Sequence, residues 1–436
     1  MPADATRAAD PKVPFEKYVL SNGLEVILHQ DRRVPLVAVD VWYHVGSGDE
    51  TVGKTGFAHL FEHMMFQGST HVGEDQHFEI LQKIGASEVN GSTNSDRTNY
   101  YEVVPANQIE TALWLESDRM GWLLPLLNDA SLGNQRDVVR NERRQRYDNV
   151  PYGKDRFASA AALFPEGHPL RYLTIGRHED LERASAEDVK GFFRHWYRPS
   201  NATLVVAGDF DVAAAKKLVE KWFGDFPVTA KPVHRPIPYE PLMAPKKETI
   251  ADPLAKLRRL HYSWMTTGLY QPGDAELDIL SSALGNGGTG RLWKILVHDK
   301  QLAQGVSVSQ VSPQHTFSVV IDLRSDADAA AVEKIVDEEI ERVMHEPIST
   351  RELQRAVVEV EGSFVWRLEP LMARAELLQG YNHYVGNPDF ITMDLDRYRK
   401  ATAEGVRDAA AKYLSKSARA EIISLPEAQA TAGGAK

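Results

Sequence analysis

The feature that most constrains the fold is a weak internal repeat on either side of a proline-rich segment. Residues 189–197 align without gaps with residues 406–414, and the same offset of 217 residues places the apolar run 204–206 on 421–423. Between the two copies, residues 226–247 contain six prolines, a density typical of an extended, semi-rigid linker. Because repeats of this length indicate duplicated domains, the sequence predicts two lobes of about the same size.

Each half is predicted to be an α+β lobe, with an antiparallel-rich sheet covered by helices. In the first half, the alternating apolar residues of 24–30 and 36–45 predict an antiparallel pair of strands. Residues 87–93 and 97–105 predict a hairpin, and a helix is expected over about 51–67. The second half is expected to repeat this order of elements.

The length of 436 residues also favours more than one domain. The predicted organisation is a flexible N-terminus (1–15), a first lobe (16–226), a linker (227–247), a second lobe (248–427) and a flexible tail (428–436).

Composition excludes several classes of protein. The net charge of -11 is opposite to that of a typical nucleic-acid binder, and no apolar run approaches the ~20 residues of a membrane span. The chain has no cysteine, so disulfides are excluded and any metal must be held by His, Asp or Glu. The first 15 residues fit either a frayed cytoplasmic terminus or the start of an exported, periplasmic protein, so the compartment stays open.

The segment "HLFEHMMFQG" carries the chemistry of the first half. His59 and His63 are four residues apart, so on a helix they lie on one face, with Glu62 beside them among apolar neighbours. H-x-x-E-H is a zinc-hydrolase signature: two imidazoles bind the metal, and a carboxylate off the metal takes a proton from the bound water. The alternative is a pair of hydrogen-bonded, partly exposed histidines without a metal.

A third ligand must come from another element, and the predicted helix 131–148 offers Glu142. Glu142 lies four residues after Val138, which we expect to face inward. The alternative is an internal ion pair between Glu142 and one of the arginines of the same helix. At the 217-residue offset, His59 and His63 fall on Glu276 and Leu280, so the second half carries no matching ligands.

Five segments, in order, resemble one family: "GFAHLFEHMMFQGS", "VNGSTNSDRTNYY", "VVRNERRQRYDNVPYG", "HPLRYLTIGRHEDL" and "YRPSNATLVVAGDFD". They are similar to the inverted-zincin peptidases of the pitrilysin and insulinase type. The length and the two-lobe layout resemble the subunits of the mitochondrial-processing-peptidase-like subfamily. The resemblance covers nearly the whole chain, strongly in the first half and weakly in the second.

The resemblance implies that the chain is half of a clamshell and a zinc endopeptidase or oligopeptidase with one Zn²⁺ per chain. It assigns His59, His63 and Glu142 as zinc ligands and Glu62 as the general base.

It also implies that an unfolded peptide is bound as an added strand along a sheet edge. The matching edge is "VNGST", so Asn90, Gly91 and Ser92 are candidate substrate contacts. A plain hairpin is the alternative for these residues.

Two departures from the family pattern concern the site. Gln135 stands where larger members have a second glutamate, which puts an assisting carboxylate in doubt. The Arg and Tyr that hold the substrate in active members fall on Val297 and Gln304, neither of which can replace them. We therefore expect a heterodimer with a homologous, zinc-less chain that supplies Arg and Tyr; a homodimer is possible but should be weak.

Two other functions remain open at this stage. One is a non-catalytic structural or peptide-binding subunit of the same fold, which intact His59, Glu62, His63 and Glu142 argue against. The other is a zinc hydrolase that acts on something other than peptides.

Overall fold

The computed structural model describes residues 9–427. The predicted tail 428–436 and the first eight residues of the predicted N-terminal segment lie outside this range. Residues 9–15 form no helix or strand, but Val13 is buried against the first lobe and Asp10 pairs with Arg399. Among the described residues, no helix is long and apolar enough to cross a membrane.

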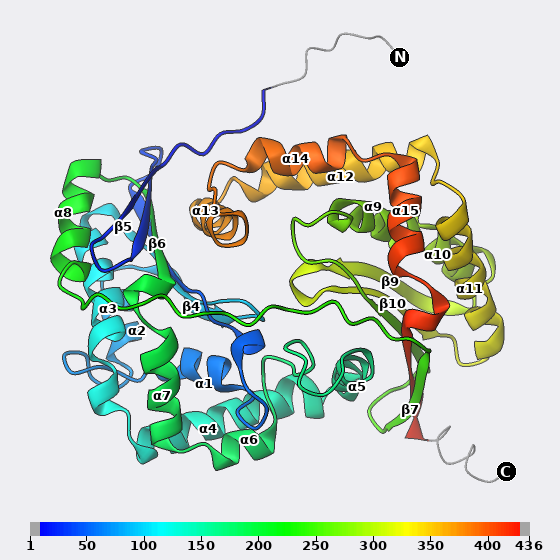
Figure 1. Cartoon of the computed structure of the whole chain (residues 1–436), viewed down its shortest axis with the longest axis horizontal. Coiled ribbons are helices and arrows are strands. Elements are labelled where there is room, and N and C mark those ends of the chain that lie inside the picture. Colours follow the sequence, from blue (N-terminus) through cyan, green and yellow to red (C-terminus); the bar gives the residue numbers. More distant parts are fainter. Residues whose placement is uncertain (1–8, 428–436) are drawn as a thin grey trace.

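The chain forms two β-sheets, one in each half, that share a five-strand topology, and β1 is an additional edge strand of the first (Figure 1). The first has six strands in the order β1-β2-β6-β3-β5-β4, and the second has five in the order β7-β11-β8-β10-β9. The strands of the first sheet are β1 (Glu16–Val19), β2 (Glu25–Gln30), β3 (Leu36–Tyr43), β4 (Ser87–Thr93), β5 (Thr98–Pro105) and β6 (Ala202–Gly208). Those of the second are β7 (Lys246–Asp252), β8 (Arg259–Met265), β9 (Ala303–Val311), β10 (Thr316–Leu323) and β11 (Arg419–Pro426).

The predicted antiparallel pairing of β2 with β3 is wrong, because β6 lies between them. β2 runs parallel to β6, with Val26 opposite Leu204, and β3 runs antiparallel to β6, with Val39 opposite Val206. β6 is buried along its whole length, so it is stable only in the middle of the sheet, where both of its faces are covered. The predicted hairpin of β4 and β5 is confirmed.

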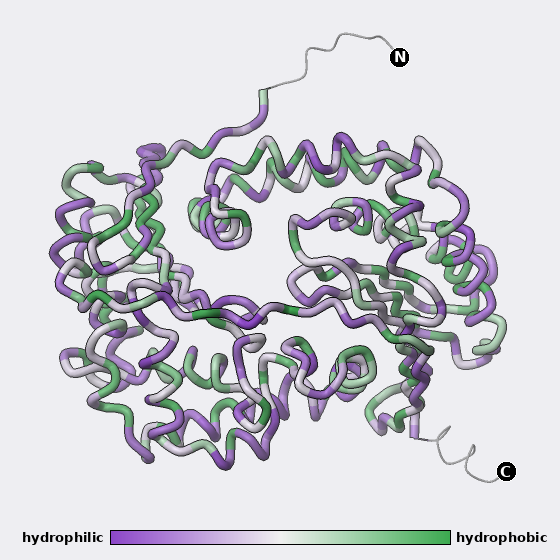
Figure 2. The backbone as a smooth tube through the Cα atoms, viewed as in Figure 1, coloured by the Kyte–Doolittle hydropathy of each residue, from purple (hydrophilic) through white to green (hydrophobic). Residues whose placement is uncertain are grey.

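Helices cover both sheets. In the first half they are α1 (Phe57–Met64), α2 (Gln76–Lys83), α3 (Ile109–Trp122), α4 (Asp129–Arg143), α5 (Gly153–Leu163), α6 (His178–Arg183), α7 (Ala186–Trp196) and α8 (Val212–Phe223). In the second half they are α9 (Asp274–Gly285), α10 (Arg291–Trp293), α11 (Ala329–His345), α12 (Thr350–Arg367), α13 (Leu371–Val385), α14 (Ile391–Arg399) and α15 (Ala403–Tyr413). The helices along the rim alternate between hydrophilic and hydrophobic residues (Figure 2), as amphipathic helices on a core do.

The internal repeat is confirmed at the level of elements. The 217-residue offset carries α7 onto α15 and the first residue of β6 onto the first residue of β11. It also carries Gly56 onto Gly273, and both glycines adopt a left-handed conformation, with φ of 86° and 94°, directly before a helix. Only glycine adopts this conformation without strain, so the turn that starts each helix is preserved in both copies.

The two halves exchange one helix each. α13 of the second half covers the first sheet, where Leu378 and Tyr381 belong to a buried cluster with Ile27 and Val205. α5 of the first half covers the second sheet, where Leu163 packs in a cluster with Ile422. Figure 1 shows both exchanged helices lying between the sheets. Each predicted lobe is therefore completed by a helix from the other.

The proline-rich segment crosses from one half to the other without helix or strand up to residue 245 (Figure 1). β7 begins at Lys246, inside the segment 227–247 that was predicted as a linker.

Candidate metal centre

α1 is held in place by a buried carboxylate at its N-terminus. The expected helix over 51–67 is shorter, because residues 51–56 form turns and the chain enters α1 through Gly56. Glu50 accepts hydrogen bonds from the backbone N–H groups of Gly56 and Ala58, both at 2.8 Å. These N–H groups have no partner within the helix, so Glu50 satisfies them and fixes where α1 starts.

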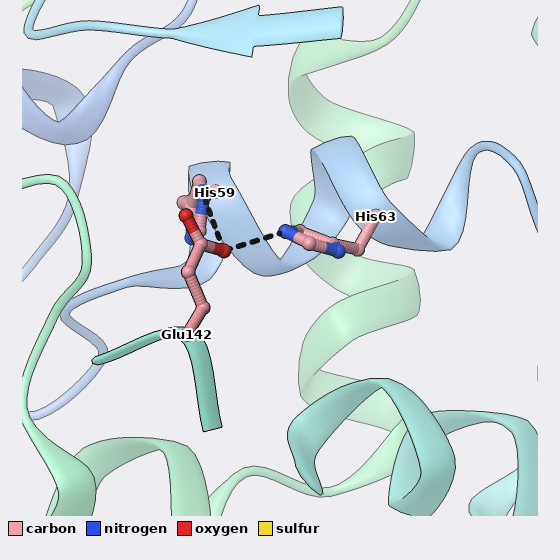
Figure 3. Close-up of side chains that lie close together, drawn as sticks. All are labelled: His59, His63 and Glu142. Atoms are coloured by element: carbon pink, nitrogen blue, oxygen red, sulfur yellow. Dashed lines mark ion pairs between the residues drawn. The ribbon is translucent and has the colours of Figure 1, made fainter. Parts of the chain in front are cut away.

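His59 and His63 lie on one face of α1, and Glu142 of α4 points between them (Figure 3). Glu142 Oε2 is 3.5 Å from His59 Nε2 and 3.2 Å from His63 Nε2. The three candidate ligand atoms all lie within 4.8 Å of one another. The structure therefore brings Glu142 next to His59 and His63, which precede it by 83 and 79 positions in the sequence.

The reason given for Glu142 from the sequence was partly wrong. Val138 is 44% exposed and does not face inward. The buried face of α4 is formed by Leu132, Gln135 and Val139, and Glu142 follows Val139 by three residues on that face. The helix phase was therefore misjudged by one residue, although the same side chain reaches the site.

The geometry fits a zinc ion. Four ligands placed tetrahedrally at the usual 2.0–2.1 Å from zinc lie about 3.3 Å apart. The two separations from Glu142 Oε2 to the imidazole nitrogens, 3.5 and 3.2 Å, match that spacing. Two imidazoles and one carboxylate are also the protein ligands of many catalytic zinc sites, which keep a fourth position for water.

The protonation of these groups suits metal binding. Burial, followed by the nearby His63, lowers the pKa of His59 to about 4, so its imidazole is neutral at pH 7. Burial opposes ionisation of Glu142, but the hydrogen bond from His63 and the charges around it outweigh burial and lower the pKa of this carboxyl. Metal ligands must be deprotonated, and both residues are.

The alternative ion pair of Glu142 with an arginine is also present. Arg146 Nη1 lies 2.9 Å from Glu142 Oε1, whereas the contacts to the two histidines are made by Oε2. The two contacts use different oxygens of one carboxylate, so they do not compete. Arg146 therefore orients Glu142 toward the histidines.

Glu62 lies on α1 between the two histidines in sequence and is half-buried. Burial raises the pKa of Glu62, and a hydrogen bond from Thr93 opposes that effect. Thr93 Oγ1 donates to Glu62 Oε2 at 2.6 Å. Thr93 was not singled out from the sequence, although it ends the quoted segment "VNGST"; only the hairpin fold brings it to α1.

Asn90, Gly91 and Ser92 belong to β4, the edge strand of the first sheet, which contacts α1. Of the three, Gly91 lies against Glu62: a Cβ atom added to it would be 3.1 Å from Glu62 Cγ. Ser92 Oγ donates to Asn99 Oδ1 at 2.7 Å. The structure thus places the predicted substrate edge beside Glu62.

The remaining predicted positions lie on different elements. Gln135 is buried on α4, two turns before Glu142. In the second half, Val297 packs partly buried in the helical turn Lys294–Asp299, and Gln304 is exposed on the edge strand β9.

A second group of potential ligands lies in the first half and was not predicted. His77, Glu102 and Glu116 are buried, and their ligand atoms also lie within 4.8 Å of one another. The Arg119 guanidinium stands among them, 3.0 Å from His77 Nε2 and hydrogen-bonded to Glu116. Burial, followed by the nearby Glu116, raises the pKa of Glu102 well above its ordinary range, so the Arg119 cation pairs with Glu116 as the charged carboxylate. This group is therefore a structural ion-pair cluster rather than a metal centre.

Comparison with known proteins identifies the family. The model of "Insulinase (Peptidase family M16)" matches residues 25–163, and that of "Peptidase M16 inactive domain" matches residues 183–359. The two models together cover most of the chain, and the chain belongs to the M16 peptidase family. The split of the models agrees with the candidate ligands, all of which lie in the part matched by the first.

Relatives of the chain are named as proteases. "Zinc protease PqqE" of Helicobacter pylori is 29% identical over 395 residues, which cover 87% of each chain. The crystal structure of a protease from Helicobacter pylori matches with a TM-score of 0.86 at 24% identity, covering 96% of this chain and 100% of the other. The periplasmic protease PqqL from Escherichia coli matches with a TM-score of 0.76 at 17% identity, covering 98% of this chain but 49% of that one. This chain therefore has the fold of about half of the PqqL chain.

Proposed function

We propose that this protein is the zinc-bearing subunit of a metalloendopeptidase or oligopeptidase that hydrolyses unfolded peptides. The observation that carries the proposal is the convergence of His59, His63 and Glu142 next to Glu62 and the open edge of β4. Membership of the M16 family and a relative named as a zinc protease support it.

Each residue has a defined role in this proposal. His59, His63 and Glu142 would hold one Zn²⁺, which would supply a water of lowered pKa at this site. Glu62 would act as the general base, accepting a proton and returning it to the amine of the leaving peptide. Thr93 holds one oxygen of Glu62, and Oε1 accepts no hydrogen bond from residues 9–427, so Oε1 takes the proton.

The edge of β4 binds the substrate. An extended peptide that adds to this edge gains main-chain hydrogen bonds whatever its sequence. Folded proteins present few free extended segments, so unfolded peptides are the substrate class. Because Gly91 has no side chain, the peptide has room to lie close to Glu62.

A second chain completes the site in this proposal. Val297 has no hydrogen-bond donor and Gln304 lacks a phenol, so this chain does not supply the Arg and Tyr that the family resemblance implies. The match to about half of the PqqL chain supports a partner of similar fold. We propose a homologous, zinc-less subunit of the mitochondrial-processing-peptidase-like type as that partner.

The test is zinc content together with hydrolysis of an unfolded peptide, measured for the native chain, Glu62→Gln and the control Glu79→Gln, each with and without the candidate partner. Glu79 is an exposed residue of α2, so its variant should behave like the native chain. We expect one zinc per chain in all three, and hydrolysis that requires both Glu62 and the partner.

Two results would overturn different parts of this proposal. Full activity of the native chain alone refutes the heterodimer but leaves the peptidase standing. A preparation without zinc that cleaves nothing even with the partner refutes the peptidase and favours a structural or peptide-binding subunit.

A further inference from the structure

The turn that joins β4 to β5 decides which backbone groups of β4 face its open edge. Asn94 N–H donates to the Arg97 carbonyl at 3.0 Å, so these two residues form a hydrogen-bonded pair. Hydrogen-bonded and non-hydrogen-bonded pairs alternate along an antiparallel ladder. Ser92 opposite Asn99 is therefore a bonded pair, and the backbone groups of Thr93 point away from β5.

The same alternation applies to Gly91. Gly91 pairs with Tyr100 in a non-bonded pair, so its backbone groups also face the edge. Its N–H is 2.9 Å from the side-chain Oδ1 of Asn90 rather than bonded into the ladder. Gly91 and Thr93 therefore direct their backbone groups to the edge where an added strand would bind, although the Gly91 N–H is engaged by Asn90 Oδ1. The backbone groups of Asn90 and Ser92 are used within the hairpin.

Side chains follow the same two-residue period. Gly91 and Thr93 face α1, where Thr93 Oγ1 donates to Glu62 Oε2 at 2.6 Å and the α-carbon of Gly91 lies against Glu62. Ser92 faces the opposite side of the sheet and bonds to Asn99. Thr93 is thus the residue that touches Glu62 through its side chain and presents its backbone to the substrate edge.

We infer that Thr93 is a positioning residue that couples binding of the peptide strand to the orientation of Glu62, an inference that rests on the proposed function. A peptide paired with the backbone of Thr93 fixes that residue, and its hydroxyl then holds Oε2 so that Oε1 faces the water to be deprotonated. A short peptide that does not reach Thr93 leaves Glu62 less constrained. Extended substrates are therefore favoured in the catalytic step as well as in binding.

Two substitutions separate the hydroxyl from the shape of Thr93. Thr93→Val keeps a β-branched side chain but removes the donor, and Thr93→Ser keeps the donor. The matched control is Thr111→Val on α3, which removes a hydroxyl whose one side-chain hydrogen bond within residues 9–427 is to Gln108. All are assayed as full chains with the partner, using one unfolded peptide, with zinc content and both kinetic constants measured.

Because hydrogen bonds to charged groups are strong, Thr93→Val should lower kcat about ten- to a hundredfold, with zinc content and KM close to native. Thr93→Ser should recover most of kcat, and Thr111→Val should match the native chain.

Three results overturn the inference. One is native kcat in Thr93→Val, and another is loss of zinc in that variant, which would show a structural role. The third is an equal loss in Thr93→Ser. If the native chain is active and any of these three results is found, only the role of Thr93 is refuted. If the native chain cleaves nothing with its partner, the proposed function and this inference are refuted together.

Discussion

The exchange of helices between the halves predicts that the molecule unfolds as one unit. Leu378 of α13 is 0% exposed and belongs to a cluster with Ile27, Ala38 and Val205 of the first sheet. Leu378→Ala removes three carbon atoms from this contact, which costs about 3 kcal/mol at a well-packed site. The substitution should destabilise both halves, because the helix comes from one half and the sheet from the other.

The size of the thermal shift follows from the length of the cooperative unit. At about 2.1 cal/mol/K of unfolding entropy per residue, the described chain has an unfolding entropy of about 0.9 kcal/mol/K, so Tm should fall by about 3–4 °C in a single transition. An independent half would have half that entropy, and its Tm would fall by about 7 °C while the other stayed in place.

Calorimetry measures the shift, and hydrogen exchange of β2 and β6 reports on the first half separately. We expect faster exchange in both strands for Leu378→Ala. The control Val365→Ala removes two methyl groups from a side chain that is 59% exposed and should change neither Tm nor exchange. Two separate transitions, with exchange in β2 and β6 unchanged in Leu378→Ala, would refute the coupling of the halves.

Three further predictions concern the site and the interface between the halves. Glu142→Gln should weaken zinc binding by more than about a hundredfold in a competitive chelator titration, while Asp137→Asn on the exposed face of α4 should leave it unchanged. Gly91→Ala places a Cβ 3.1 Å from Glu62 Cγ and should lower kcat/KM at least about tenfold with zinc retained; native activity would show that Glu62 does not need its observed position. His383 Nδ1 lies 3.1 Å from His44 Nδ1 at this interface, and burial, followed by the nearby His234, lowers the pKa of His383 to about 4. Below about pH 6.5, His383 is protonated in the unfolded chain but stays neutral in the folded chain. The contribution of His383 to the free energy of unfolding is therefore fully present above pH 6.5 and is lost as the pH falls toward 4. Urea unfolding at pH 7 and pH 5 should show a loss of about 1–2 kcal/mol from this residue that is absent in His383→Gln, and an equal loss in both proteins would contradict the assignment.

The sequence predicted those parts of the fold that depend on local patterns. The spacing of His59 and His63 and the β4–β5 hairpin follow from short-range patterns, and the duplication follows from two similar segments 217 residues apart; each is present in the structure. Whether the three candidate ligands bind zinc remains a prediction.

Other features depend on contacts between distant segments. β6 inserts between β2 and β3 from more than 150 residues away, and no local pattern in either strand indicates it. The exchange of α5 and α13 is hidden for the same reason, since an amphipathic helix does not specify which sheet it covers. Thr93 was missed because its role needs both the register of β4 and the position of α1.

Comparison of the two halves separates what the fold requires from what the chemistry requires. Gly56 and Gly273 keep the same left-handed turn, because each starts a helix that must pack in the same orientation on the sheet of its own half. At the positions of the histidines the second half has Glu276 and Leu280, and α9 still packs its buried residues against β9 and α15. Two imidazoles on α1 are thus not needed to build this helix, since its copy is built without them. Their presence on the buried side of α1, together with Glu142, is what favours the proposal of a metal there, since a zinc ion would accept two neutral nitrogens and a carboxylate together.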